Sequence, residues 1–510
     1  MSTAMRFERA ILLNSPSPPG FVANKDSMGG FGQLYPAGAP AAPPLDLPYL
    51  AAYLRREGIP VEVLEAGALR LARAQCTARL AKMAAGGRPL VLVRTSLPTL
   101  DWDLDYCAEL RRAAVTESLA LIGPVLPSVL FRVEQTQDVD FALLGEPEAA
   151  VVELMRGAAP AEIRGLAYRG ADGAWARTPA RPLVRDLDEL PWPAWDLFPR
   201  ELYVIPKSAV EGRRRYLPML TSRGCPYGCN YCPYPVGQGE RWRARSPRDV
   251  VDEMEHLRRD FGIEYVIFRD PMFSLDQRRV REICREITSR GIELHWRCET
   301  RLDCLDEETL AAMAAAGCRG INFGIESSDP EIQRGVGRRP IEREEFRRKT
   351  RLCRQHGIET FAFFIVGLPG DDAASILDSI EFALEIDASW VQFTVSTPFI
   401  GTRLHAWAVD RGLVAAGFYR IVSSHQGSVG NETLTAAEIR RLHRFARLLQ
   451  DTLINRSGLL KNAARRSPLY RAAKRAADAL CAWLARGALR VARRWFERSP
   501  RAASPALPAA

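Results

Sequence analysis

Short apolar runs alternate with amphipathic stretches over residues 1–155. The stretch LDLPYLAAYLRREG, for example, places Leu47, Leu50 and Leu54 on one helical face. Strands that are apolar throughout and separated by helices predict a parallel sheet that is covered on both sides. The runs predicted as strands are 9–15, 61–66, 89–96, 119–125 and 139–146. Five such units predict an α/β, flavodoxin-like (Rossmann-type) doubly wound domain, whose ligands should lie beyond the carboxyl ends of its strands.

The pattern changes over residues 156–212. The segment IRGLAYRGADGAWARTP predicts a β-hairpin that turns at Ala171, Asp172 and Gly173. The following LPWPAWDLFPRELY is rich in Pro and Trp, and we expect its Trp and Phe side chains to pack on a neighbouring element. We therefore place a connector between two domains here.

Strand–helix alternation resumes over residues 213–425. Ser246 and Pro247 mark one helix start, as an N-cap and a first helical residue. The predicted strands are 216–222, 265–270, 293–299, 319–326, 359–367 and 389–397. Six successive strand–helix units predict a partial (β/α)6, TIM-like barrel, with its chemistry at the carboxyl ends of the strands.

Residues 426–510 lack strand signals and predict helices. Thr435 and Glu438 form a capping box. Further on, the residues that share one apolar helical stripe are Leu469, Ala473, Ala476, Leu480, Trp483, Gly487, Val491 and Trp495. Six arginines occupy the rest of that helix: Arg471, Arg475, Arg486, Arg490, Arg493 and Arg494. The end, SPRAASPALPAA, is predicted to be disordered.

Charge is concentrated in the C-terminal region. The chain has 510 residues and a net charge of +9, but residues 456–510 hold 13 Lys and Arg against 2 acidic residues. The remainder is therefore slightly acidic, which disfavours a uniformly basic nucleic-acid-binding protein. No secretory signal and no apolar run of spanning length are found, so we expect a cytoplasmic protein.

The basic tail leaves three interpretations open. The helix could pack on the barrel with a solvated basic face, or lie on the inner face of a membrane through residues 456–498. An RNA-binding role is the third, but aromatic residues are sparse and no RNA-binding motif is found, so we expect no nucleic acid.

Three cysteines crowd the segment TSRGCPYGCNYC, which follows the first predicted barrel strand. Cys225, Cys229 and Cys232 have the spacing CxxxCxxC. With 11 Cys in so long a chain, a disulfide scaffold is disfavoured. Iron–sulfur clusters usually take four thiolates, so three would leave one iron open to another ligand. The alternatives are a purely structural role and a zinc site. A zinc site would need a fourth ligand, and the nearest His, His256, lies on the following helix.

This spacing, with Tyr231 before the last cysteine, resembles the signature of the radical SAM superfamily. The resemblance implies a 4Fe-4S cluster whose open iron binds S-adenosylmethionine (SAM) and cleaves it to a 5′-deoxyadenosyl radical. GINFGIESSD and FFIVGLPGD resemble the fourth- and fifth-strand motifs, and FRDPMFSLD carries an Asp where many members have a GGE-type element. The residues implied for SAM are Tyr231, Asp270, Glu326, Ser327, Val366, Gly367 and Pro369.

The first domain resembles the cobalamin domain of one radical SAM subgroup. The segments that carry this likeness are PPLDLPYLAAYLRREG, IGPVLPS and VDFALLGEPE. All 6 His lie at or after His256, so this domain has no His to bind cobalt. Either cobalamin binds without that ligand or the domain binds no corrin. The residues implied for cobalamin are Thr95, Ser96, Gly123 and Pro124.

We therefore expect an enzyme that methylates an unactivated carbon of a small-molecule or lipid-like substrate, with a reductant such as flavodoxin or ferredoxin. One alternative is radical oxidation or cyclisation, as in relatives that resemble the anaerobic Mg-protoporphyrin ester cyclase. Another is a non-catalytic metal-binding RNA or scaffold module. Cys298 or Cys304, which flank the end of the third barrel strand, could reach the active-site mouth.

Overall fold

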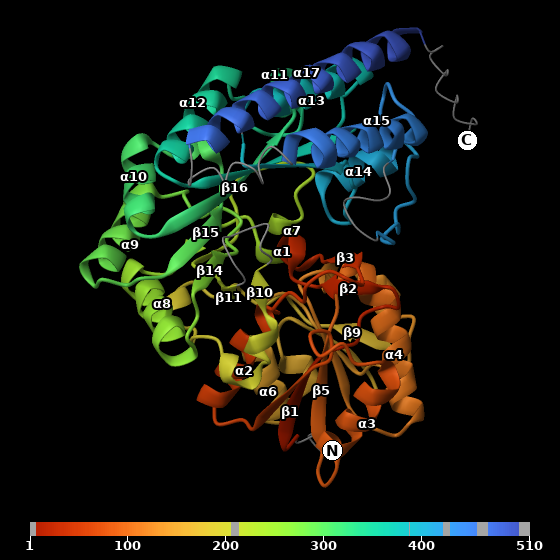
Figure 1. Cartoon of the computed structure of the whole chain (residues 1–510). Helices are drawn as coiled ribbons and strands as arrows, with labels where there is room; N and C mark the ends of the chain where they lie inside the picture. Colours follow the sequence, from red (N-terminus) through yellow and green to blue (C-terminus); the bar gives the residue numbers. More distant parts are fainter. Residues whose placement is uncertain (1–6, 206–213, 387, 422–428, 456–467, 499–510) are drawn as a thin grey trace.

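The computed structural model describes residues 7–205, 214–386, 388–421, 429–455 and 468–498 (Figure 1). Figure 1 shows an N-terminal α/β domain below a second, larger α/β domain, with two C-terminal helices lying across the upper one. Residues 499–510, predicted to be disordered, lie outside the described residues, and so do residues 456–467 of the basic tail.

The N-terminal sheet confirms the doubly wound prediction. Its five parallel strands follow the flavodoxin order: β4 (Val61–Glu65), β1 (Arg9–Asn14), β5 (Pro89–Arg94), β6 (Leu119–Ile122) and β7 (Phe141–Leu143). Alternate residues of β1 face two separate cores, with Leu12 in one and Ile11 in the other. The first core takes in α2 (Asp46–Arg56) and α6 (Glu148–Met155), and the second takes in α3 (Arg73–Ala84), α4 (Leu100–Arg112) and α5 (Leu126–Val133).

The predicted hairpin exists, but it belongs to this first sheet. β8 (Leu166–Arg169) pairs antiparallel with β7 and with β9 (Trp175–Arg177). The Gly173 N–H closes the turn onto the Gly170 carbonyl at 2.9 Å. The boundary placed at residue 155 was therefore wrong, because the sheet of the N-terminal domain continues to Arg177.

A second hairpin was not predicted. β2 (Phe21–Asn24) and β3 (Gln33–Pro36) pair antiparallel, and α1 (Ser27–Gly30) lies between them. Its strands have four residues each, without a regular apolar alternation, and its connection holds three glycines with positive φ: Gly29, Gly30 and Gly32. The hairpin covers the carboxyl end of the first sheet on the side that faces the second domain (Figure 1).

The second domain confirms the partial barrel. Six parallel strands stand in chain order: β11 (Arg214–Met219), β14 (Tyr265–Phe268), β15 (His295–Glu299), β16 (Cys318–Glu326), β17 (Glu359–Val366) and β18 (Trp390–Val395). A short antiparallel strand, β10 (Val204–Ile205), pairs with β11 at the edge. The helices on the outer face are α8 (Pro247–Phe261), α9 (Gln277–Ser289), α10 (Glu307–Ala315), α12 (Arg343–Gln355) and α13 (Ala373–Glu385). Ser246 caps α8 as predicted, because its hydroxyl accepts the Asp249 N–H at 3.2 Å.

The connector ties the two domains together. Trp195 is fully buried and packs edge-on against Phe198, with ring centroids 5.7 Å apart. The Ala194 N–H donates to the Pro48 carbonyl of α2 at 3.0 Å, and Trp192 Nε1 donates to Asp249 of α8 at 2.9 Å. The connector therefore packs on both domains, as its Trp and Phe content predicts.

Two C-terminal helices complete the molecule. α15 (Ala436–Leu449) begins with the predicted capping box, in which the Thr435 N–H donates to Glu438 at 2.8 Å. α17 (Pro468–Arg498) lies against α13 (Figure 1). Among the described residues, no helix combines the length and apolar character needed to cross a bilayer.

Candidate active site

The three clustered cysteines lie on one loop at the carboxyl end of β11. The loop leaves β12 (Ser222–Arg223) and enters α7 (Tyr234–Gln238). Backbone hydrogen bonds fix its course: the Cys225 N–H donates to Gly239 at 3.2 Å and the Cys232 N–H to Cys229 at 3.2 Å. All three cysteines are free thiols, so the structure contradicts a disulfide.

Glycines allow this loop to fold tightly. Gly224 has φ +82°, and a Cβ added there would lie 2.2 Å from the Arg241 carbonyl oxygen. A Cβ on Gly337, in a neighbouring turn, would lie 2.5 Å from the Gly228 oxygen. A side chain at either position would collide with backbone and displace the cysteines.

The three cysteines do not present the converged ligand set of a single ion. Among the described residues, no three His, Cys, Asp or Glu side chains converge as the ligands of one metal ion must. Zinc needs such convergence, because its ligand atoms all lie about 2.0–2.3 Å from one centre. A four-iron cluster binds each thiolate on a different iron and has no such requirement. Burial raises the pKa of Cys225 and Cys232, so these thiols need a cationic partner such as iron to stay deprotonated.

A buried network connects the cysteine loop to β16. The Glu326 carboxylate accepts the Tyr231 hydroxyl at 2.9 Å and Arg338 Nη1 at 2.9 Å. Arg338 also donates to the Tyr231 oxygen at 3.0 Å and to the Gly324 carbonyl at 2.7 Å. Burial raises the pKa of Glu326, and the Arg338 guanidinium opposes that rise. Two of the residues predicted to hold SAM, Tyr231 and Glu326, are thus brought together by an arginine that sequence reasoning missed.

The backbone at this point is unusual. Glu326 has φ +67°, a backbone conformation that residues other than Gly rarely adopt. A Cβ on Gly324 would lie 1.9 Å from the Glu326 Oε1 atom, so position 324 must lack a side chain. Ser327, the next predicted SAM residue, is buried, and its hydroxyl accepts the Asp329 N–H at 3.1 Å. The Ser327 hydroxyl therefore shapes the turn that follows β16.

The turn after β17 is held by two further residues. The N–H groups of Gly367 and Leu368 donate to the Asp371 carboxylate at 3.0 and 2.9 Å. The Asn431 side chain donates to the Leu368 and Asp371 carbonyls at 2.9 Å each. Burial raises the pKa of Asp371 to about 7. Val366, Gly367 and Pro369, predicted near adenine, thus belong to a turn whose supports, Asp371 and Asn431, the sequence motif did not reveal.

Asp270 forms hydrogen bonds with the start of the cysteine loop. It is fully buried, and its carboxylate accepts the Thr221 N–H at 2.7 Å, the Ser222 hydroxyl at 2.7 Å and the Thr221 hydroxyl. These donors lie at the start of the cysteine loop. Asp270 therefore positions the loop through these bonds, and its contact with SAM stays a prediction.

Four polar side chains that sequence reasoning missed converge where the two domains meet. Arg269 and Glu299, at the ends of β14 and β15, form an ion pair, and the Tyr234 hydroxyl donates to Glu299 at 3.2 Å. Burial lowers the pKa of Arg269, but Glu299 and the surrounding tyrosines, Tyr35 of the β2–β3 hairpin among them, raise it overall. The pair is a quarter exposed, so it can contact a bound molecule.

A cavity of 80 Å³ separates the cysteine loop from the first domain. It is lined by Gly123, Pro124 and Gly145 at the strand ends of the first sheet, and by Tyr234 and Arg269 of the barrel. Two of the four residues predicted for cobalamin therefore face it.

The other two predicted cobalamin residues do not line this cavity. Thr95 and Ser96 are fully buried, and the Ser96 hydroxyl is paired with Thr99 at 2.9 Å at the start of the 3-10 turn η1 (Leu97–Thr99). Ser96 thus caps this turn, and its contact with cobalamin stays a prediction.

The lining fits a corrin in chemistry, but the cavity is too small for one. Glycine backbone offers flat surfaces beside a macrocycle, and none of the first-domain residues is His. However, α1 meets α7 here: a Cβ on Gly237 would lie 2.7 Å from the Gly29 oxygen, and one on Gly29 would lie 2.9 Å from the Tyr234 ring. A corrin is larger than this cavity, and we expect α1 and α7 to separate where it enters.

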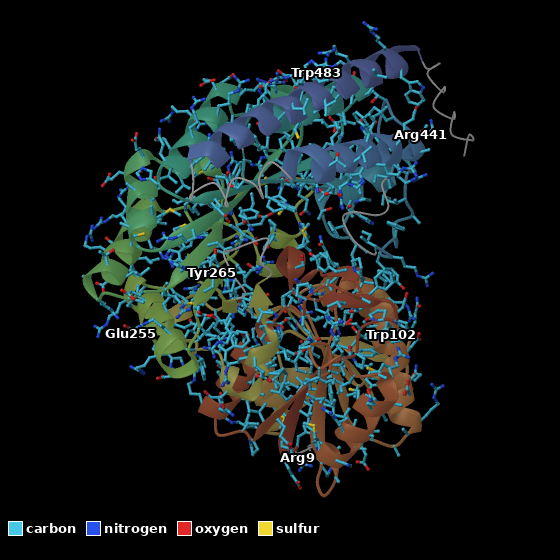
Figure 2. The ribbon with its side chains drawn as sticks, in the orientation of Figure 1. Arg9, Trp102, Glu255, Tyr265, Arg441 and Trp483 are labelled. Carbon is cyan, nitrogen blue, oxygen red and sulfur yellow. The ribbon has the colours of Figure 1, made fainter. Side chains whose placement is uncertain are left out.

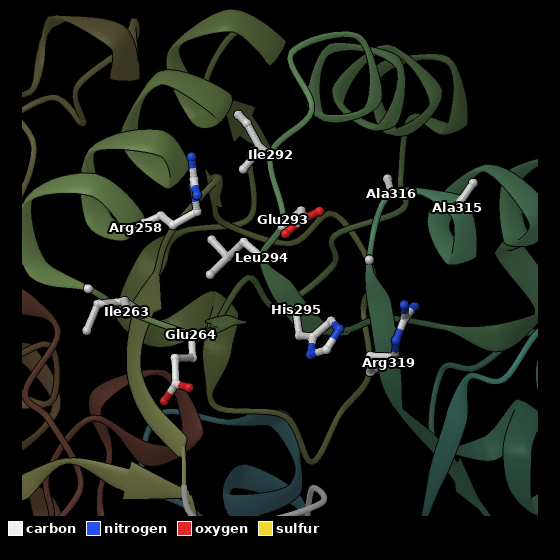
Figure 3. Close-up of a pocket in the computed structure, with 12 residues that line it drawn as sticks. Arg258, Ile263, Glu264, Ile292, Glu293, Leu294, His295, Ala315, Ala316 and Arg319 are labelled. Carbon is white, nitrogen blue, oxygen red and sulfur yellow. The ribbon is translucent and has the colours of Figure 1, made fainter.

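A larger cavity lies elsewhere. It measures 580 Å³ and is lined by Glu264, His295 and Arg319, among others (Figure 3). These residues lie at the amino ends of β14 to β16, the end of the barrel away from the cysteines. In barrels of this kind catalysis occurs at the other end, so this cavity is not the candidate site.

Comparison with known proteins agrees with this geometry. Residues 219–383, which include the cysteine loop and the turns after β16 and β17, match the Radical SAM superfamily. The chain is a radical SAM enzyme. It is 28% identical over 415 residues to an uncharacterised methyltransferase of Pyrococcus horikoshii, covering 79% of this chain and 86% of the relative.

This radical SAM enzyme is also similar to two further proteins, one in sequence and one in fold. It is 25% identical over 373 residues to the anaerobic magnesium-protoporphyrin IX monomethyl ester cyclase of Rubrivivax gelatinosus, covering 70% of this chain and 64% of the cyclase. Its fold matches TsrM of Kitasatospora setae, a radical SAM methyltransferase solved with cobalamin and a [4Fe-4S] cluster bound. The TM-score is 0.62 at 24% identity, over 79% of this chain and 78% of TsrM. This last likeness establishes the two-domain fold.

Cys298 and Cys304, the two cysteines expected near the active-site mouth, lie in different surroundings. Cys298 is fully buried within the sheet. The Cys304 sulfur lies 3.4 Å from the hydroxyl of Tyr227, which stands between Cys225 and Cys229. Of the two, only Cys304 touches the cysteine loop.

Proposed function

We propose that this radical SAM enzyme is a cobalamin-dependent methyltransferase that acts on an unactivated carbon of a small molecule. One observation carries the proposal: the residues that flank the cysteine loop, Arg223 and Tyr234, and the strand ends of the first domain line the same cavity. Tyr234, two residues after Cys232, lines that cavity together with Gly123 and Pro124. A methyl carrier in the first domain would thus adjoin a radical source in the second.

The residues divide into three tasks. Cys225, Cys229 and Cys232 would hold a 4Fe-4S cluster, and the network of Tyr231, Glu326 and Arg338 would position SAM beside it. When bound, the cluster and SAM supply a radical that removes hydrogen from carbon, and cobalamin supplies a methyl group. Arg269, Glu299 and Tyr234, which are partly exposed between the domains, would orient the substrate. Closure of α1 on α7 would exclude water from these groups.

The partners follow from this reaction. A small-molecule or lipid-like substrate, and a reductant such as flavodoxin or ferredoxin, are part of the proposal. A contact of residues 456–498 with a membrane is a further proposal. The exposed apolar side chains of α17 support it.

Anaerobic reconstitution tests the proposal. The protein is loaded with iron, sulfide and hydroxocobalamin, given SAM and a reductant, and scored for 5′-deoxyadenosine, S-adenosylhomocysteine and bound corrin. We expect both nucleosides and a stoichiometric corrin. Deoxyadenosine without S-adenosylhomocysteine would favour oxidation or cyclisation, in line with the likeness to the cyclase. One bound zinc and no SAM cleavage would contradict an enzyme and favour a metal-binding module.

A further inference from the structure

Among the side chains that the structure describes, the large apolar ones with the greatest exposure lie on two C-terminal helices. Those residues are 45–68% exposed: Leu448 on α15, and Leu480, Trp483, Leu484, Val491 and Trp495 on α17. The other exposed large apolar residues are scattered over different elements and are only 37–38% exposed. Grouped exposure of this kind marks an interaction surface, whereas scattered single residues need no explanation. We call the five residues on α17 the outer stripe.

The outer stripe is not the surface that holds α17 on the barrel. Ala485 and Leu489 form a separate inner face and are 0% and 2% exposed. On the same helix, Arg493 pairs with Glu381 of α13 at 2.7 Å. The apolar stripe predicted from the sequence therefore turns outward where its side chains are described, and a different face packs on the barrel. Figure 2 shows Trp483 on the outer side of the helix.

Helical geometry places three residues of the outer stripe on one line. Leu480, Leu484 and Val491 are spaced i, i+4 and i+11, which puts them within about 40° of one another around the helix axis. Arg486, Arg490 and Arg494, spaced four apart and all exposed, form a second row beside them. Residues 479–495 contain no acidic residue. The outer surface of α17 thus combines a continuous apolar line with a basic edge.

We infer that the outer stripe and its arginine row form a docking surface for an anionic lipid bilayer. Aliphatic side chains and Trp insert at the boundary between headgroups and acyl chains, and arginine binds lipid phosphates beside them. The helix lies flat on the protein, in agreement with the finding that no described helix can span a membrane. Figure 1 shows the N-terminal domain at the opposite end of the molecule, so it would point away from the bilayer.

Charge argues against other occupants. Two copies of this chain pairing through α17 would bring their arginine rows together, with no acid in residues 479–495 to neutralise them. An RNA strand would leave the aliphatic line of Leu480, Leu484 and Val491 uncovered, because single-stranded RNA is bound through aromatic rings and cations. The inference does not depend on the reaction proposed for the active site.

Co-sedimentation with lipid vesicles tests the inference on the full-length, reconstituted chain. The vesicles contain phosphatidylglycerol and phosphatidylcholine in equal parts, or phosphatidylcholine alone. The stripe variant carries Leu480→Gln, Trp483→Gln and Val491→Gln, and its matched control carries Leu69→Gln, Phe131→Gln and Leu202→Gln at exposed apolar positions elsewhere. A third variant carries Arg486→Gln, Arg490→Gln and Arg494→Gln.

The wild type and the matched control should bind anionic vesicles alike. We expect the stripe variant to bind at least about tenfold more weakly. The arginine variant should bind about a hundredfold more weakly and lose its dependence on salt. Unchanged SAM cleavage in solution shows that each variant is folded and separates a failure here from a failure of the proposed reaction.

Four results would overturn the inference. The wild type could stay in the supernatant with anionic vesicles, or bind phosphatidylcholine equally well. It could instead form a dimer in solution that the stripe variant dissociates, which would assign the surface to a second copy. Retention of a single-stranded RNA probe without vesicle binding would assign it to RNA.

Discussion

Two strand-end regions meet where the domains join, and they are built differently. At the barrel mouth, hydrogen-bonded side chains fix the functional groups, as Arg338 and Tyr231 do for Glu326. At the mouth of the first sheet, glycines line the cavity beside the carboxylates of Asp26, Asp46, Glu146 and Glu148, and further charged side chains are paired elsewhere in the domain. Lys25 and Asp103, for example, are almost fully buried and lie 3.1 Å apart.

The difference concerns how each region recognises its ligand. A barrel mouth lined by oriented side chains is prepared to bind and orient polar groups before they arrive. A glycine-lined mouth presents backbone surface and closes on itself through α1 and α7. We therefore expect substitutions at the barrel mouth to act on chemistry and stability, and substitutions at the first mouth to act on opening.

The largest effect should follow the loss of one cluster thiol. We expect Cys225→Ala to abolish SAM cleavage and to lower bound iron, because the remaining two thiolates cannot hold a four-iron cluster. Iron and sulfide analysis with deoxyadenosine measurement checks this. Cys481→Ala, a half-buried cysteine on α17, is the matched control and should keep both iron and activity. Full activity of Cys225→Ala would show that the cysteine loop does not hold the cluster that cleaves SAM.

The next effect should follow the loss of Arg338. We expect Arg338→Met to lower the free energy of unfolding by about 3–5 kcal/mol, because it leaves the buried Glu326 carboxylate without its cation. Urea unfolding measures it. Adding Glu326→Gln should restore most of the stability but not SAM binding. If the double variant regains SAM affinity as well, the network supports the fold alone.

A pH effect should follow from Asp371. Its pKa is raised from 3.8 to about 7 by burial, so the folded state keeps a proton that the unfolded state releases. Unfolding free energy should therefore fall as pH rises between about 4 and 7, by up to about 4 kcal/mol, and level off above that range. Asp371→Asn should lack this component in matched urea titrations. Identical pH slopes for both proteins would contradict the prediction.

The smallest effect should appear at the first mouth. We expect Gly237→Ala to weaken the contact of α1 with α7, because the added Cβ would collide with the Gly29 oxygen. The form in which α1 and α7 touch is then less populated, so cobalamin affinity should rise about fivefold. SAM cleavage should stay within about twofold. Ser96→Ala is the comparison, since the Ser96 hydroxyl only caps a turn, and it should leave corrin affinity unchanged. Titration with hydroxocobalamin measures both affinities. Equal affinities for the two variants would contradict the expectation that α1 and α7 separate when cobalamin binds.

The sequence predicted both sheets and the cysteine loop, because apolar periodicity and cysteine spacing are local signals. It did not predict the partners of the site. Arg338 lies 12 residues beyond Glu326, and Asn431 lies 63 residues beyond the carbonyl it supports, so only folding joins them. The hydrogen bonds of Asp270 and Ser96 were not predicted for the same reason. A residue at a strand end can either face a cavity or bond to its own loop, and the sequence does not distinguish these outcomes.

The central claim is that the two mouths form one active site, and electron paramagnetic resonance tests it most directly. The protein is loaded with cluster and cobalamin, and the reduced cluster and cob(II)alamin are observed in the same sample. Two unpaired electrons on either side of one cavity should broaden each other's signals, and Cys225→Ala should restore the narrow cob(II)alamin spectrum. A narrow cob(II)alamin spectrum in the fully loaded wild type would contradict the account.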